Sequence, residues 1–87
     1  NTALHSIAVY TQDFSGTLMI QATLSTDPGS SDYFNITPTG ESTNELRFSS
    51  SSTVTNFNFT GVYQFVRFSW GNDTGNTGKI DKILYRQ

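Results

Sequence analysis

Residues 71–78 (Gly-Asn-Asp-Thr-Gly-Asn-Thr-Gly) form the part of the sequence best suited to holding a metal ion. Asn72, Asp73 and Asn76 offer amide and carboxylate oxygens, and calcium in proteins is bound by oxygen ligands. The segment does not contain the bidentate glutamate that closes a complete calcium-binding loop. Glycine, asparagine and aspartate are also common turn residues, so a plain loop between two strands is the alternative. Ca²⁺ is the only cofactor that the sequence suggests.

The groups that catalysis requires are scarce in this sequence. There is no cysteine, and the single histidine, His5, has no partner at a spacing that indicates a catalytic triad. Asp27 and Asp73 lie in or beside glycine-containing turns, and turn chemistry accounts for both. Nucleophilic, acid–base and metal catalysis each need several converging groups. The sequence therefore predicts a protein that is not an enzyme.

Aromatic side chains are the candidates for a binding surface, because exposed rings can stack on the apolar faces of sugars. Tyr33, Tyr63 and Trp70 are the predicted binding residues, together with Arg67. Trp70 is the first choice because it ends a predicted strand and enters the glycine-rich segment. A role as a lid on the core is the alternative for Trp70, and the usual burial of large aromatic side chains favours that role.

Arg67 interrupts an otherwise apolar stretch, so its charge needs a partner. An unpaired buried charge is costly, and the guanidinium group presents a planar fork that suits a carboxylate. We therefore expect Arg67 to pair with an acid such as Asp81 or Glu45. A position at a subunit boundary is the alternative.

Length and composition restrict the fold that positions these residues. The chain has 87 residues, which is enough for one domain, and it has no cysteine for a disulfide. Seven phenylalanines, four tyrosines and one tryptophan provide a core of few, large side chains. The phenylalanines expected in this core are Phe34, Phe57, Phe59, Phe65 and Phe68. A core this small indicates that neighbouring subunits help to stabilise the domain.

The charge pattern restricts the partners. The net charge is −2, and the five basic residues form no run in the sequence, so we expect no nucleic acid partner. No apolar stretch approaches the roughly 20 residues that span a bilayer, so we expect no membrane insertion. A strand is predicted almost at the first residue, Asn1, which indicates a piece of a longer chain or larger assembly.

Apolar and polar residues alternate along the chain with a period of two, which predicts strands with one buried face. In residues 16–25 the inward set is Leu18, Ile20, Ala22 and Leu24. Residues 6–11 form the preceding strand, and the polar residues between the two segments predict a turn. We therefore expect these two strands to form a hairpin.

Five further short strands are expected, at residues 33–37, 45–48, 53–60, 62–70 and 79–86. The serine run at residues 49–52 is expected to be a loop. The strand at 62–70 is apolar on both faces, so both faces should be covered by a second sheet, a loop or a partner. In the last strand Ile80 and Leu84 are expected on one face, opposite Ile83 and Tyr85.

Seven short strands separated by turn residues predict a single all-β domain over residues 1–87, an antiparallel β-sandwich of the jelly-roll type. Helical periodicity is nearly absent, and the residues that favour helices are scarce.

Three segments carry a resemblance to a known family: residues 16–24 (Gly-Thr-Leu-Met-Ile-Gln-Ala-Thr-Leu), 33–36 (Tyr-Phe-Asn-Ile) and 59–68 (Phe-Thr-Gly-Val-Tyr-Gln-Phe-Val-Arg-Phe). The pattern resembles galactose-binding-like, or discoidin-like, jelly rolls. Residues 78–86 (Gly-Lys-Ile-Asp-Lys-Ile-Leu-Tyr-Arg) are similar to the ending of small virion domains of tailed bacteriophages. Such modules occur in tail fibres, baseplates and capsid decorations, and the resemblance extends over residues 14–86, nearly the whole chain.

The resemblance implies a structural or attachment module of a phage virion, located in the virion or outside the cell. Its expected partners are other virion proteins or identical subunits, and its contacts would be between proteins. The alternative is a carbohydrate-binding module that attaches a larger protein to a cell-surface glycan, with Trp70 and a tyrosine as the binding platform.

Overall fold

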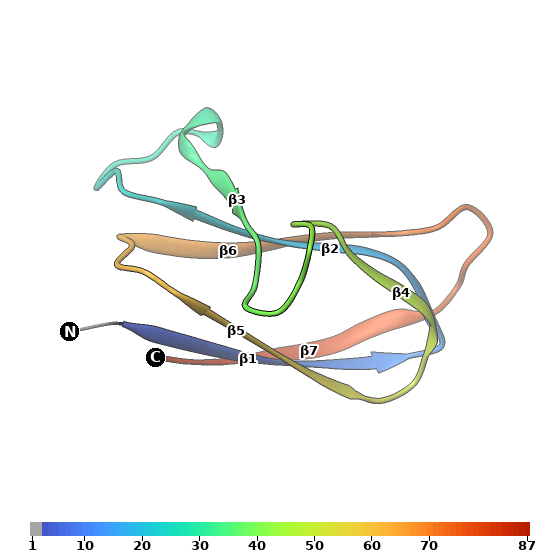
Figure 1. The fold of residues 1–87 in the computed structure, drawn as a ribbon. Coiled ribbons are helices and arrows are strands. Elements are labelled where there is room, and N and C mark those ends of the chain that lie inside the picture. The colour runs from blue at the N-terminus through green and yellow to red at the C-terminus, as the bar shows by residue number, and fades with distance from the viewer. Residues whose placement is uncertain (1–2) are drawn as a thin grey trace.

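The computed structural model describes residues 3–87, which form two antiparallel β-sheets packed face to face (Figure 1). The seven strands are β1 (Leu4–Gln12), β2 (Phe14–Thr23), β3 (Phe34–Ile36), β4 (Leu46–Ser51), β5 (Val54–Thr60), β6 (Phe65–Asn72) and β7 (Lys79–Arg86). A short 3-10 turn, η1 (Ser30–Asp32), lies between β2 and β3. The predicted all-β fold, an antiparallel sandwich of seven strands, is confirmed.

Each sheet is built around a central strand. In the first sheet β1 lies between β5 and β7. In the second sheet β6 pairs with β2 along one edge, while β3 and β4 pair with successive parts of the other edge of β2. The Phe68 and Tyr85 rings meet on the side where β6 and β7 lie, and the Phe48 and Phe57 rings meet where β4 and β5 lie. The sandwich therefore has two lateral sides, which we call the β6/β7 side and the β4/β5 side.

The core follows the predicted alternation in the two central strands. Ile7 and Val9 of β1, and Leu18 and Ile20 of β2, are fully buried between the sheets. The whole buried apolar set is Ile7, Val9, Phe14, Leu18, Ile20, Ala22, Ile36, Leu46, Phe48 and Phe59. Leu24 was expected in this set, but that prediction is wrong: β2 ends at Thr23, and Leu24 is 68% exposed.

The predicted hairpin of the first two strands is wrong, because the chain changes sheets between them. Asp13 separates β1 from β2 and has a positive φ of 52°. β1 pairs with β5 in one sheet, and β2 pairs with β4 in the other. The chain from β4 to β5 crosses beside Asp13, whose backbone nitrogen donates to Ser52 Oγ at 2.8 Å. The two antiparallel pairs, β1 with β5 and β2 with β4, therefore form one ribbon that folds across both sheets.

The serine run is part of this crossing rather than the expected loop. Ser49, Ser50 and Ser51 end strand β4. Ser51 Oγ lies 2.7 Å from Thr11 Oγ1, and the backbone nitrogen of Ser50 donates to Ser15 Oγ at 2.8 Å. Small hydroxyl side chains can satisfy backbone groups where the regular ladder is interrupted. These hydrogen bonds therefore connect the end of β4 to β1 and β2, at the point where the chain passes from one sheet to the other.

A β-bulge in β7 reverses part of the predicted pattern. Tyr10 pairs with Lys82 and Thr11 pairs with Ile80, so Asp81 is an extra residue on β7. An extra residue shifts the side-chain alternation by one position. Ile80 therefore shares the inner face with Ile83 and Tyr85 while Leu84 is exposed, so the expectation that Ile80 and Leu84 share one face is wrong.

Strand β6 differs from its prediction at its first residues. It begins at Phe65 rather than at residue 62, and Val62 is 75% exposed outside the strand. Phe59 is buried, and Phe57 and Phe68 pack against the core as expected. Phe65 is 45% exposed and Phe34 is 43% exposed, so their assignment to the core is wrong. Phe65 is exposed because it lies on the outer face of the edge strand β6, which is turned away from the first sheet.

Candidate functional site

Two of the four predicted binding residues, Tyr33 and Arg67, meet on the outer face of the second sheet. The Arg67 guanidinium carbon lies 3.8 Å from the centre of the Tyr33 ring. Arg67 Nε donates to Gln21 Oε1 at 2.7 Å, and Gln21 Nε2 donates to Asn35 Oδ1 at 2.9 Å. The predicted pairing of Arg67 with Asp81 or Glu45 is wrong. The side-chain amide of Gln21 and the face of the Tyr33 ring contact the Arg67 guanidinium group instead of a carboxylate.

Tyr63 lies elsewhere, at the end of the sandwich beside His5. Its ring centre is 5.7 Å from that of His5 and 5.9 Å from that of Phe34. Its hydroxyl donates to the carbonyl of Thr60 at 3.0 Å. Tyr63 therefore packs the end of the core and does not join Arg67.

Trp70 stands on the core-facing side of β6, opposite Leu18 of β2. Arg67 pairs with Gln21 on the outer face, so Trp70 and Arg67 lie on opposite faces of the same strand. Trp70 is 49% exposed because β6 is an edge strand. The four predicted binding residues are thus distributed over three places, and no single platform contains both Trp70 and Tyr33.

His5 is a buried residue with both ring nitrogens hydrogen bonded. Nε2 lies 2.8 Å from the carbonyl oxygen of Gly61, and Nδ1 lies 2.5 Å from the hydroxyl of Tyr85. A carbonyl can only accept, so Nε2 carries the proton and neutral Nδ1 accepts from Tyr85. Burial raises the pKa of the Tyr85 hydroxyl. These contacts connect the beginning of β1 to the end of β7 and to Gly61 just after β5. Both ring nitrogens of His5 are therefore occupied.

The predicted metal-binding loop uses its oxygen atoms internally. Asn76 Oδ1 accepts from Asn72 Nδ2 at 2.8 Å and from the backbone nitrogens of Ser15 and Gly78 at 3.1 and 3.2 Å. The two carboxylate oxygens of Asp73 accept from the guanidinium group of Arg47 at 3.2 and 2.8 Å. A cation at this loop would have to displace Arg47. Within residues 3–87, no three His, Cys, Asp or Glu side chains are placed to hold a metal ion.

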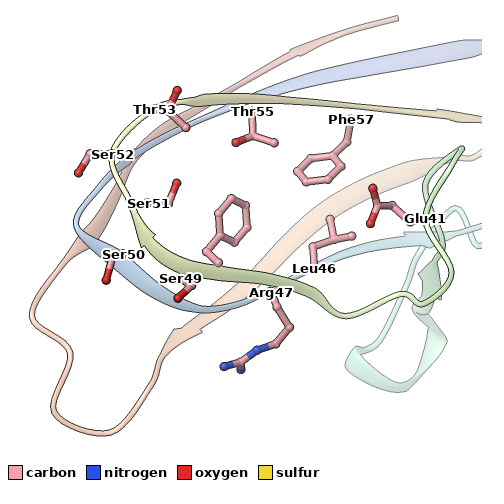
Figure 2. A pocket seen from close by; sticks show the side chains of 11 residues that line it. Glu41, Leu46, Arg47, Ser49, Ser50, Ser51, Ser52, Thr53, Thr55 and Phe57 are labelled. Carbon is pink, nitrogen blue, oxygen red and sulfur yellow. The ribbon is translucent and has the colours of Figure 1, made fainter.

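The β4/β5 side carries a wedge-shaped groove of about 580 Å³. Figure 2 shows β4 and β5 meeting near Ser52 and Thr53 and diverging toward Phe57 and Glu41. The apolar floor is formed by Leu46, Phe48 and Phe57, and serine and threonine hydroxyls line the narrow end. The Arg47 side chain points away from the space between the strands (Figure 2), toward its partner Asp73.

The β6/β7 side carries a smaller groove of about 290 Å³ between two edge strands. Its walls are mainly apolar and aromatic: Tyr63, Phe65, Val66, Phe68 and Tyr85, with Gln64 and Gln87 at the rim. β6 pairs with β2 over its full length without a register shift, so its other edge is free along all eight residues. An apolar groove thus lies beside an unpaired strand edge.

The fold separates the charges that are mixed in the overall composition. Residues 65–87 contain four of the five basic residues and two acids, whereas residues 1–64 contain one base and five acids. The four bases are Arg67, Lys79, Lys82 and Arg86, all on β6 and β7. Glu41 lines the groove of the β4/β5 side and Glu45 immediately precedes β4, and within residues 3–87 neither forms an ion pair. The late position of the basic residues in the sequence is the signal that could have predicted this asymmetry.

Comparison of the chain with protein-family models, curated protein sequences and solved structures found no match. Within residues 3–87 there is also no helix with the length and apolar character of a membrane span. The candidate surfaces therefore have to be interpreted from their own residues.

Proposed function

We propose that this chain is a non-enzymatic module that joins a larger assembly through protein–protein contacts at the lateral sides of its sandwich. The observation that carries the proposal is the free edge of β6, which exposes unpaired backbone groups next to an apolar groove. Such an edge can pair with a strand of another protein, because main-chain hydrogen bonds and side-chain pockets then act together.

The contrast between β6 and β7 supports this proposal. Edge strands are usually protected from unwanted pairing by charges, bulges or proline. β7 has such protection, with a bulge at Asp81 and the charged residues Lys79 and Lys82. β6 has no proline and no bulge, and its only charge, Arg67, is held on the outer face by Tyr33. The strand without protection is the one suited to a partner.

The half-exposed aromatic residues of β6 give the contact an apolar component. Phe65 and Trp70 project from opposite faces of the strand, so a partner at this edge could bury both rings. Aromatic residues dominate the binding energy of many protein interfaces. The sequence resemblance to virion domains supports the particle of a tailed phage as the assembly in which this contact forms.

The test compares incorporation of wild-type and variant protein into the proposed assembly, the particle of a tailed phage. The variants Phe65→Ser and Trp70→Ser should reduce incorporation at least about tenfold. Leu24→Ser is the control, because Leu24 is also apolar and is even more exposed, at 68%, but lies outside β6. Circular dichroism and thermal unfolding establish that each variant is folded. Equal incorporation of all three folded variants would contradict the proposal.

A second candidate function, attachment to a glycan, is favoured by the Tyr33–Arg67 cluster. This cluster presents an aromatic ring, a guanidinium group and two amides on one exposed sheet face. Sugar sites combine ring faces with fixed polar groups of this kind. On a glycan array, Tyr33→Ala should then abolish binding and Trp70→Ala should retain it, because Trp70 lies on the other face of β6. Absence of binding by the wild type would reject this candidate.

A further inference from the structure

The two lateral sides of the sandwich are complementary in charge and in shape. The β6/β7 side has positive charge, with Lys82 and Arg86 exposed along β7, while Lys79 Nζ pairs with Asp81 Oδ1 at 3.4 Å. The β4/β5 side has an open groove, with Glu41 at its wide end and Glu45 just before β4. Arg47 borders this groove, but its side chain points away from the space between the strands (Figure 2), and Asp73 neutralises its charge. Within residues 3–87, Glu41 and Glu45 are therefore the charges of this side that form no ion pair.

We infer that the partner of this module is a second copy of the same chain, whose basic β6/β7 side docks against the acidic β4/β5 side of its neighbour. The inference rests on the proposed function and names the partner. The contact is head-to-tail, because each of the two copies contributes a different surface to it.

Electrostatics distinguishes this arrangement from a symmetric dimer. If two β6/β7 sides met, the bases of one β7 strand would face those of the other, and like charges across an interface are unfavourable. Two β4/β5 sides would bring Glu41 and Glu45 of both copies together. A head-to-tail contact instead places bases opposite acids.

The shapes of the two sides also fit a head-to-tail contact. The β4/β5 groove widens away from the corner at Ser52 and Thr53, so it can admit a strand edge with side chains (Figure 2). Its floor offers partly exposed apolar surface at Phe57, and its walls offer hydroxyls that can pair with backbone groups. The β6/β7 side provides an unpaired strand edge and exposed apolar residues, Trp70 and Leu84.

A contact between different surfaces leaves one surface of each kind free at the ends of a pair. Further copies can therefore add, and the assembly closes into a ring or grows as a filament according to the rotation between copies. Sedimentation of the wild type should accordingly show species larger than a dimer, which dissociate as salt increases because exposed charges are screened.

Charge reversal on each side tests the inference. The basic-side variant carries Lys82→Glu and Arg86→Glu, and the acidic-side variant carries Glu41→Lys and Glu45→Lys. Each alone places like charges at the contact, so its self-association measured by sedimentation velocity should weaken at least about tenfold. Mixing the two variants should restore association, because each then presents the charge that the other lacks. All four residues are exposed, so both variants should fold.

The control variant Thr26→Lys/Asp27→Lys adds positive charge in the β2–β3 connection, away from both sides, and should associate like the wild type. A wild type that stays monomeric at all concentrations would overturn the inference. So would reversal variants that associate normally, or a mixture that fails to associate. None of these results affects the incorporation test with Phe65→Ser and Trp70→Ser, so failure of the inference and failure of the proposed function are distinguishable.

Discussion

The hydroxyl of Tyr85 lies 2.5 Å from Nδ1 of His5, and this contact joins the first and last strands across 80 positions of the sequence. The His5 ring also stacks on Phe59 at 4.7 Å between ring centres, which adds β5 to the same cluster. A buried imidazole is stable only when both nitrogens have partners. Tyr85 and the Gly61 carbonyl supply them.

Removal of the Tyr85 hydroxyl should destabilise the fold by leaving His5 Nδ1 buried without a donor. We expect Tyr85→Phe to lower the free energy of unfolding by about 1–3 kcal/mol. Denaturant unfolding measures this change. Tyr10→Phe is the matched control, because the Tyr10 hydroxyl has no hydrogen bond within residues 3–87. Equal effects of the two substitutions would show that the His5 contact does not contribute to stability.

Stability should fall at alkaline pH through the same tyrosine. Burial raises the pKa of Tyr85 above its ordinary value of about 10. Above about pH 10 the unfolded state therefore loses this proton before the folded state does, and the free energy of unfolding decreases with rising pH. Below about pH 10 the contribution is fully present. Unfolding measured across this range should show a shallower alkaline decrease in Tyr85→Phe than in the wild type, and identical slopes would contradict the prediction.

Asn76 should be the most sensitive residue of the loop between β6 and β7. Its side-chain oxygen accepts three hydrogen bonds, and its nitrogen donates to the carbonyl of Asp13 at 3.0 Å. Asn76→Ala leaves several of these groups unpaired, so we expect a loss of about 1–3 kcal/mol. Thr74→Ala, at the exposed tip of the loop, should have little effect. Thermal unfolding of both variants measures the difference in stability. An Asn76→Ala variant as stable as the wild type would contradict the stabilising role of the Asn76 hydrogen bonds.

Gly78 should not tolerate a side chain, although its backbone conformation is not left-handed. A Cβ at this position would collide with the backbone carbonyl of Asp13, and a backbone group cannot move aside like a flexible side chain. We expect Gly78→Ala to cost about 1–3 kcal/mol. Gly71→Ala provides the comparison, because a Cβ there meets no atom within 4 Å. If both variants unfold at the same temperature, the close approach at Asp13 is not a constraint.

Several features of the fold could be predicted from the sequence because they depend on local alternation. The inward positions of Ile7, Val9, Leu18 and Ile20 follow from the period of two, since successive side chains of a strand point to opposite faces. The turn residues of the loop from Asn72 to Gly78 also predicted its position between the last two strands. The inward faces of the two central strands, β1 and β2 up to its end at Thr23, were therefore determined by the sequence alone.

Strand pairing and the candidate site were decided only by the tertiary structure. The polar residues before β2 predicted a hairpin, but Asp13 turns the chain into the other sheet, where β2 can bury its apolar face against β1. A single extra residue, Asp81, places Ile80 on the inner face with Ile83 and Tyr85 rather than on the face of Leu84, and alternation alone could not show this. Arg67 contacts Gln21 and Tyr33 rather than an acid, because the β2–β6 register places Gln21 opposite it and the Tyr33 ring lies under its guanidinium group. Alternation acts between neighbours in sequence, whereas pairing and register depend on which distant strands bury their faces together.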